Sequence, residues 1–272
     1  MVIPSISTYF GDPVKSIFLA AVVLLSFANG MAQITIEPVE YKQGEAVLEG
    51  YVAYDASQKG KQPGIVIVHD WMGVSDYVKM RAEQLVKLGY VAFIADIYGK
   101  GVRPKNTQEA SEQAGKFRAD RPLLRARAQA ALDRLKESPR VDIGRIAAIG
   151  YCFGGGTILE LARSGADLAG VISFHGNLDT PNPDDAKNIK GKVLVLHGAD
   201  DPYVPAAQVE AFQAEMRKVN VDWEFVAYGG AVHAFTQKGA GDDPSKGHAY
   251  NERADKRSFA RMTTFFQELF VK

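Results

Sequence analysis

Ile146-Ala-Ala-Ile-Gly-Tyr-Cys-Phe-Gly154 runs from four apolar residues straight into a cysteine flanked by two glycines. The apolar run predicts a strand that is buried on both faces, and the residues after Gly154 are compatible with a helix. A cysteine on such a turn has the form of a nucleophile elbow, with Cys152 in the place usually taken by serine. Small residues at Gly150 and Gly154 let the strand and the helix pack closely. The stretch therefore predicts a nucleophile on a strand-to-helix turn.

The same turn would provide the electrostatics that a nucleophile needs. The N–H of Phe153 would point toward the developing oxyanion at the helix N-terminus, which also favours a thiolate over a thiol. The pentapeptide alone leaves an alternative open, because cysteine is among the most buried residue types and Cys152 could be an inert core thiol. Cys152 is the single cysteine of the chain, so a disulfide within the chain is excluded.

The segments on either side of this turn alternate between strand and helix. Alternating units with apolar strands predict an α/β fold, in which helices on both faces cover a mostly parallel sheet. The first two strands are separated by Lys42-Gln43-Gly44 and are expected to form a hairpin at the sheet edge. Strands are predicted at Ile34–Tyr41, Ala46–Tyr54, Gly64–His69, Tyr90–Ala95, Ile146–Ile149, Ala169–Phe174, Val193–Leu196 and Trp223–Ala227, and helices at Tyr77–Leu88, Pro122–Leu135, after Gly154, at Pro205–Val219 and at the C-terminus.

The composition indicates a packed globular domain without a nucleic-acid partner. Hydrophobic residues make up 46% of the chain and charged residues 24%, which is ordinary for such proteins. Lys+Arg and Asp+Glu number 32 each, so the formal net charge is zero. A balanced chain has no built-in attraction to nucleic acid or to an anionic membrane.

The N-terminus differs in character from the rest of the chain. Lys15 precedes an apolar run over 17–28, and small residues follow at Gly30 and Ala32. This is the order of a secretory signal peptide, and the run is shorter than the ~20 residues of a membrane-spanning helix. We expect residues 1–32 to be a cleaved signal peptide that exports the domain over 33–272 to the periplasm or outside the cell. An N-terminal membrane anchor is the alternative.

An aspartate and a histidine follow two later predicted strands, in the order acid and then histidine. Asp201 comes just beyond the strand that begins at Val193, and His233 comes after the last predicted strand. The chain order of nucleophile, acid and histidine is that of α/β-hydrolases. All three residues follow the carboxyl ends of strands, where open parallel sheets build their sites. These positions predict a triad of Cys152, Asp201 and His233.

At this point the sequence resembles the dienelactone hydrolase family, whose members carry a Cys-His-Asp triad on the α/β-hydrolase fold. Within that resemblance Asp201, and not its neighbour Asp200, falls at the acid position. The matching stretches lie in order along most of residues 33–272 and are Val68–Gly73, Ala95–Tyr98, Gly150–Gly155, Asp201–Pro205 and Gly229–Phe235.

The resemblance implies acyl transfer on a small-molecule ester or lactone. Cys152 would attack the carbonyl to form a thioester, His233 would move the protons, and Asp201 would orient the imidazole. The backbone N–H groups of Phe153 and Trp71 are the oxyanion donors that the resemblance implies. No cofactor is expected, because the triad needs none and the chain has no phosphate loop or dinucleotide fingerprint. The histidine and cysteine spacing suggests no metal site.

Two departures from the family pattern concern the thiol and the substrate. Asp70 stands where well-known members have a glutamate that contacts the thiol, so that contact could be direct, mediated by water or absent. Two arginines that bind a lactone carboxylate in the family are replaced here by Lys100 and Gln237. Lys100 remains a candidate substrate-binding residue, but it is a point charge and not a bidentate fork. We therefore expect a broader esterase or lactonase preference.

Three questions stay open at this point. The chain could be a non-catalytic binding or sensing module on a hydrolase scaffold, or it could transfer acyl groups to an acceptor other than water. His175, which follows a predicted strand, could be structural or could line the pocket. A monomer is favoured, although the sequence does not determine the oligomeric state.

Overall fold

The computed structural model describes residue 2 and residues 33–270, and the statements below concern residues 33–270. The predicted signal peptide, apart from residue 2, lies outside the described residues. Within the described residues, no helix is both long and apolar enough to cross a membrane.

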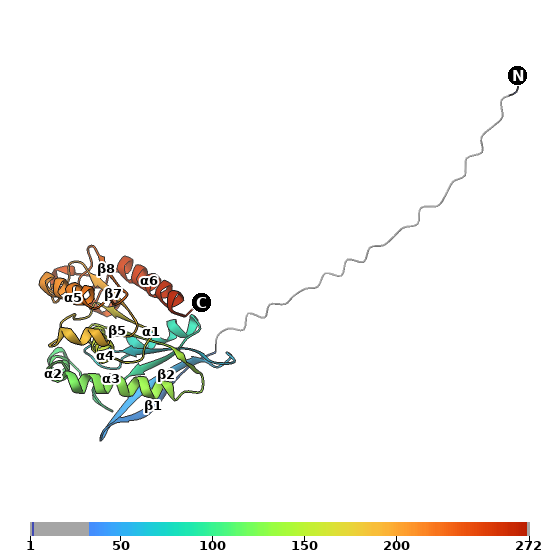
Figure 1. Cartoon of the computed structure of the whole chain (residues 1–272), viewed down its shortest axis with the longest axis horizontal. Helices are drawn as coiled ribbons and strands as arrows, with labels where there is room; N and C mark the ends of the chain where they lie inside the picture. Colours follow the sequence, from blue (N-terminus) through green and yellow to red (C-terminus); the bar gives the residue numbers. More distant parts are fainter. Residues whose placement is uncertain (1, 3–32, 271–272) are drawn as a thin grey trace. The chain divides into compact units, whose positions relative to one another are not determined.

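An eight-stranded sheet forms the centre of the domain, in the order β1-β2-β4-β3-β5-β6-β7-β8 (Figure 1). The hairpin of β1 and β2 lies at one edge, as predicted, and β2 pairs antiparallel with β4. From β4 to β8 every neighbouring pair is parallel. The strands are β1 Ile34–Gln43, β2 Ala46–Asp55, β3 Gln62–Val68, β4 Val91–Ala95, β5 Val141–Tyr151, β6 Gly170–Phe174, β7 Lys192–Gly198 and β8 Trp223–Tyr228.

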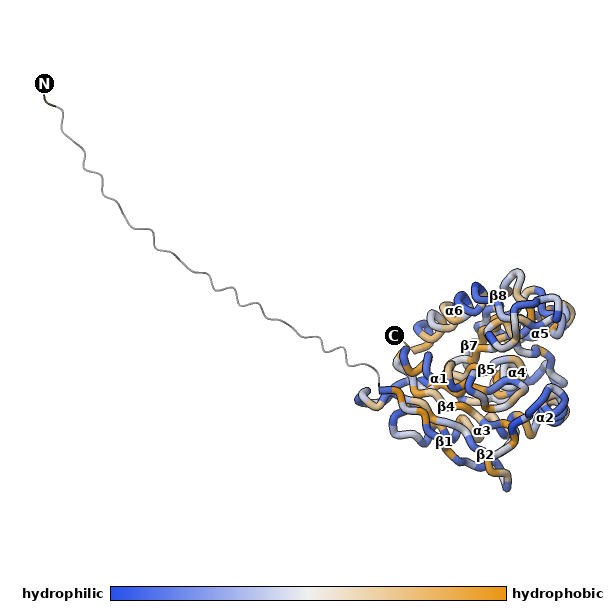
Figure 2. Tube along the Cα trace, turned by 180° about the vertical axis from the view of Figure 1, so that it is seen from behind, coloured by the Kyte–Doolittle hydropathy of each residue, from blue (hydrophilic) through white to orange (hydrophobic). Residues whose placement is uncertain are grey.

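The central strands are apolar on both faces because helices cover both faces. In β3, Ile65 and Ile67 join one hydrophobic cluster while Val66 and Val68 join the other. The first cluster packs against α1 (Asp76–Lys87) and α6 (Glu252–Phe270), and the second against α2 (Thr107–Ala119), α3 (Arg121–Lys136), α4 (Phe153–Arg163) and α5 (Ala206–Lys218). In Figure 2 the hydrophobic colouring gathers on the strands in the middle of the domain, and α2 is largely hydrophilic. The chain is thus an α/β-hydrolase fold, as the sequence predicts.

Helix α2 is the one long element that the sequence analysis did not predict. It buries just Ala110, Ala114 and Phe117, so its apolar stripe is narrow. Its start is nevertheless marked in the sequence: the Asn106 side chain accepts the N–H of Glu109, and Glu109 accepts from the Asn106 amide. This reciprocal arrangement is a capping box in function.

Two long loops, over residues 175–190 and 236–248, contain short helical turns but no strand of the sheet. The first holds the 3-10 turn Pro183–Asn188, and the second holds Lys238–Ala240 and Pro244–Lys246. Both loops leave the sheet at the carboxyl ends of its parallel strands, which is the edge where the candidate site lies.

Candidate active site

The turn from β5 into α4 places Cys152 in a left-handed conformation, with φ 55° and ψ −116°. A non-glycine residue in this region costs about 1–3 kcal/mol and persists only where neighbouring contacts fix it. Here the Cys152 N–H donates to the Phe174 carbonyl at 3.0 Å, and the Cys152 carbonyl accepts from Gly155 N–H at 2.9 Å. The strained turn directs the sulfur away from the sheet and toward the loops that follow β7 and β8.

Gly150 and Gly154 are required by the close approach of strand and helix at this turn. A Cβ on Gly150 would lie 2.0 Å from the Gly154 carbonyl oxygen, and a Cβ on Gly154 would lie 2.3 Å from the Val68 carbonyl oxygen. These are backbone atoms, which cannot swing away as a flexible side chain would. The two glycines therefore let α4 begin directly beneath the nucleophile.

Three side chains from separate strand ends meet at the sulfur. His233 Nε2 lies 3.1 Å from Cys152 Sγ, and His233 Nδ1 lies 2.8 Å from Asp201 Oδ2. The other Asp201 oxygen accepts the Tyr203 N–H at 2.9 Å, which fixes the carboxylate. The structure thus brings together the three residues that the sequence predicts as a triad, with the base between nucleophile and acid.

The electrostatics of this arrangement favour the protonated form of His233. Burial alone would lower the pKa of His233, but negative charge on the Cys152 sulfur and on the Asp201 carboxylate outweighs burial and raises the pKa to about 10. A protonated imidazole at this position would stabilise negative charge on the sulfur beside it. Because both ring nitrogens then carry protons, one faces the sulfur and the other faces Asp201.

The loop that carries His233 is held on both sides. Ala234 has a left-handed φ of 56°, which turns the chain sharply after the histidine. The His233 N–H donates to the Gly247 carbonyl at 3.2 Å, and the His233 carbonyl accepts from Ala249 N–H at 3.1 Å. These two bonds tie the catalytic histidine to the end of the long loop that follows it.

The two predicted oxyanion donors lie at the start of α4 and in the turn after β3. Neither the Phe153 nor the Trp71 N–H donates a hydrogen bond within the described residues. The Trp71 carbonyl accepts from the Tyr98 hydroxyl at 2.9 Å, and the preceding Asp70 carbonyl accepts from His69 Nδ1 at 2.6 Å. These bonds fix the backbone of the turn and leave the Trp71 N–H free for a substrate oxygen.

Asp70 is buried beside the site and is bonded to two partners. One oxygen accepts the Met72 N–H at 2.8 Å, and the other accepts from the Gln237 amide at 2.8 Å. Burial raises the pKa of Asp70 above its ordinary value. With both oxygens engaged, Asp70 makes no hydrogen bond to Cys152 within the described residues, so the thiol is paired with His233.

A cavity of about 650 Å³ opens in front of the triad. Helix α2 contributes Thr107 and Arg118 to its lining, and the loop after His233 contributes Gln237, Gly239 and Ala240. Its lining residues are Asp70, Trp71, Met72, Thr107, Arg118, Cys152, Asn177, Tyr203, His233, Ala234, Gln237, Gly239, Ala240 and His248.

Arg118 contributes a guanidinium to the lining of this cavity. The sequence analysis did not identify Arg118 as a site residue. Its Nη2 donates to the Asn177 side chain at 2.9 Å, and its guanidinium lies 5.9 Å from the centre of the Phe153 ring. Arg118 lies in the last turn of α2. It was missed because the helix that carries it was not predicted. The capping pattern of Asn106 and Glu109 is the signal that would have found both.

Lys100 lies outside this cavity. Its ammonium pairs with Glu40 on β1, and its backbone N–H donates to the Val47 carbonyl on β2. Gly99 and Gly101 have φ values of 129° and 79°, and this tight turn carries the side chain toward the hairpin. The structure therefore does not support a substrate contact by Lys100.

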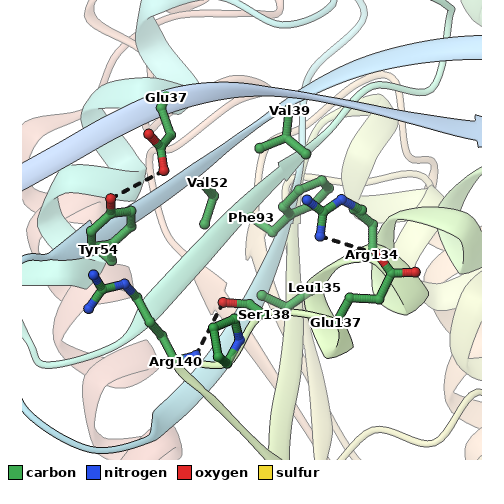
Figure 3. A pocket seen from close by; sticks show the side chains of 11 residues that line it. Glu37, Val39, Val52, Tyr54, Phe93, Arg134, Leu135, Glu137, Ser138 and Arg140 are labelled. Carbon is green, nitrogen blue, oxygen red and sulfur yellow. Dashed lines mark hydrogen bonds and ion pairs between the residues drawn. The ribbon is translucent and has the colours of Figure 1, made fainter.

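A second cavity of about 320 Å³ lies between the hairpin and the end of α3 (Figure 3). Glu37 accepts from the Tyr54 hydroxyl, and Arg134 pairs with Glu137. Two of its charged side chains thus pair with each other and a third bonds Tyr54, and its lining contains no member of the triad. Cys152 and His233 line the larger cavity instead.

Within residues 33–270, no group of three histidine, cysteine or acidic side chains is arranged to hold a metal ion.

A family model described as the dienelactone hydrolase family matches residues 48–270. The chain belongs to the dienelactone hydrolase family. It is accordingly a hydrolase of that type.

Similar proteins of known structure support this assignment over nearly the whole domain. One, designated m3DLH, is 40% identical with a TM-score of 0.84, and the match covers 88% of this chain and 99% of that one. Another, described as a dienelactone hydrolase-like promiscuous phosphotriesterase from metagenomic libraries, is also 40% identical with a TM-score of 0.84, covering 87% and 99%. A relative found by sequence is a protein of Methylorubrum extorquens, which is named as a candidate carboxymethylenebutenolidase. It is 28% identical over 85% of this chain and 81% of its own length.

Proposed function

We propose that this dienelactone hydrolase family member cleaves a carboxylic ester or lactone through a thioester on Cys152. The observation that carries the proposal is the contact of Cys152 Sγ with His233 Nε2 at 3.1 Å, at the wall of a 650 Å³ cavity. An inert core thiol would not face a histidine whose other nitrogen is bonded to a buried carboxylate.

The first half-reaction forms the thioester. The thiolate attacks the carbonyl carbon, and the N–H groups of Phe153 and Trp71 receive the charge on the oxygen. When the tetrahedral intermediate collapses, His233 gives its Nε2 proton to the leaving alkoxide, which departs as an alcohol. In a lactone the alcohol stays attached to the acyl group. Donors of this kind are each worth roughly 10²–10³ in rate.

The second half-reaction returns the enzyme to its starting state. Water takes the place of the alcohol, neutral His233 accepts its proton, and the resulting hydroxide attacks the thioester carbonyl. Collapse then releases the carboxylic acid and restores the thiolate–imidazolium pair. Asp201 keeps the imidazole oriented throughout.

The decisive experiment measures turnover of a short aryl ester and of a dienelactone by wild type, Cys152→Ala and His233→Ala. Both variants should lose at least a hundredfold in kcat/KM, because triad members act as a unit. Lys100→Ala is the matched control, since its side chain lies outside the cavity, and it should retain wild-type turnover on both substrates. Residual activity above a hundredth of wild type in either triad variant would overturn the assignment.

Hydrolysis of a neutral phosphotriester is a second candidate activity. Its support is the 40% identity, over 87% of this chain, to the protein described as a promiscuous phosphotriesterase. The sulfur would attack phosphorus in place of a carbonyl carbon. An aryl phosphotriester added to the same panel tests this candidate: wild type should release the aryl alcohol and Cys152→Ala should not.

A further inference from the structure

The two partners of the catalytic pair are both linked to the end of strand β6. Its last residue, Phe174, accepts the Cys152 N–H at 3.0 Å. The next residue, His175, is fully buried and adopts a left-handed φ of 39°. Its ring lies edge-on to the ring of His233, with 5.4 Å between the two centroids. Because the His175 ring packs directly against the catalytic base, the contacts that hold His175 bear on the orientation of His233.

A chain of hydrogen bonds holds the His175 ring from behind. His175 Nε2 lies 2.7 Å from Thr236 Oγ1, which lies 2.6 Å from the Tyr77 hydroxyl. Arg81 donates to the Tyr77 oxygen at 3.2 Å and to the Thr236 carbonyl at 2.8 Å, and it is paired with Asp255 at 2.5 Å. Since Tyr77 and Arg81 belong to α1 and Asp255 to α6, two helices hold the loop that carries the catalytic histidine.

The Thr236 hydroxyl links two groups, each of which can donate or accept a hydrogen bond. One is the Tyr77 hydroxyl, which also accepts from Arg81, and the other is His175 Nε2. His175 Nδ1 has no partner within the described residues, so the Thr236 hydroxyl is the ring's single polar anchor there. Burial, and then the charges of His233 and Arg81, hold the pKa of His175 well below its ordinary value. A neutral His175 does not compete with His233 for the catalytic proton.

We propose that Tyr77, Thr236 and His175 form a positioning network that fixes the rotation of the His233 imidazole toward Cys152. The network acts through its bond to the His175 ring and through its hold on the loop after His233. The proposal rests on the proposed function for its turnover readout, whereas the reactivity of the free thiol reports the orientation of His233 without any substrate. The titratable side chains that surround His233 are Cys152, Asp201, Asp70, His175, His197 and Tyr203.

The test replaces Thr236 with valine, which keeps its volume and branching and removes the hydroxyl. In Thr236→Val, kcat on the aryl ester should fall about 10–100-fold while KM stays within about threefold, since small misplacements of a catalytic group act on the chemical step. Alkylation of Cys152 by iodoacetamide should slow at pH 6. Its pH profile should shift toward higher pH, because a misoriented imidazolium stabilises negative charge on the sulfur less well.

Two companion variants separate positioning from folding. Thr236→Ser restores the hydroxyl and should recover both readouts. Thr263→Val removes a similar hydroxyl, which bonds the Phe259 carbonyl within α6 away from the site, and it should leave both readouts unchanged.

Either of two outcomes would overturn the proposal: a folded Thr236→Val with wild-type kcat and an unshifted alkylation profile, or failure of Thr236→Ser to recover either readout. If Thr236→Val does not fold, Tyr77→Phe removes the hydroxyl that bonds Thr236 and faces the same criteria. If wild type turns over no ester but Thr236→Val still shifts the alkylation profile, the proposed function fails and the positioning network stands.

Discussion

At the residue scale, the proposed chemistry depends on a single proton between Cys152 Sγ and His233 Nε2, 3.1 Å apart. The thiolate and Asp201 oppose the effect of burial and together set the proton affinity of the ring. Asp70, the other carboxylate near the thiol, is occupied by Met72 and Gln237. The sulfur is therefore paired with His233 and not with Asp70.

The pKa of His233 gives a direct prediction. In wild type it should titrate near pH 10, and in Cys152→Ala its pKa should fall, because the thiolate that raised it is gone while burial remains. Turnover should follow the protonation of His233. Activity should decline as pH rises through about 10, because the imidazolium that protonates the leaving group then loses its proton. Histidine-selective NMR over a pH series measures the shift. An unchanged His233 pKa in Cys152→Ala would show that the sulfur is not its charged partner.

The sequence identifies some site residues and misses others for physical reasons. Cys152, Asp201 and His233 each follow a parallel strand, so their place in the chain predicts their place at the carboxyl edge of the sheet. Lys100 was chosen because the resemblance places it where the family has an arginine, and this correspondence cannot show that two glycines turn its side chain to Glu40. Arg118 carries no motif, and its role depends on the path of a helix whose apolar stripe is narrow.

At the scale of elements, the junction of β5 and α4 places the nucleophile by bringing the two backbones unusually close together. The neighbours of Gly150 and Gly154 there are main-chain atoms, so no rotamer change can make room for a larger residue. The N-terminus of α4 can therefore lie beneath Cys152 only because Gly150 and Gly154 have no Cβ.

Gly150→Ala should strongly destabilise the fold, by about 3 kcal/mol or more, because its Cβ would lie 2.0 Å from the Gly154 carbonyl oxygen. Gly115→Ala is a matched control inside α2, where nothing lies within 4 Å of the added Cβ. There alanine should raise the free energy of unfolding by about 0.5–1 kcal/mol. Urea denaturation measures both changes. A Gly150→Ala variant as stable as wild type would contradict the close approach.

Element prediction succeeded where the apolar pattern is strong and failed where it is weak. The central strands were anticipated because unbroken apolar runs such as Ile65–Val68 fit a strand covered on both faces. Their ends were less accurate: β5 begins at Val141, five residues before the predicted start, where exposed residues interrupt the apolar pattern. The same lack of a strong pattern hid α2.

At the scale of the whole molecule, the hairpin could be predicted from the sequence, whereas the size of the large cavity could not. The hairpin closes one edge of the sheet and contributes no lining residue to the large cavity. The topology, with antiparallel strands confined to that edge, could be predicted from the hairpin pattern followed by alternating units. The size of the cavity could not, because it depends on how α2 and the loop after His233 face each other.

We further propose that residues 1–32 are a signal peptide, on the basis of Lys15, the apolar run and the small residues that follow it. N-terminal sequencing of the protein recovered from the cells that produce it should then give a mature chain beginning near residue 33, outside the cytoplasm. A full-length chain recovered in the membrane fraction would instead support the anchor.

Two segments that lie far apart in the sequence contribute to the lining of the large cavity, and this matters for laboratory evolution. Thr107 and Arg118 come from α2, whereas Gly239, Ala240 and His248 come from a loop more than a hundred residues later in the chain. Neither segment supplies a strand, the nucleophile or the acid. A library over residues 107–118 could therefore be screened separately from one over 237–248. A single crossover between the two segments would then recombine the best variants while the catalytic machinery is inherited unchanged.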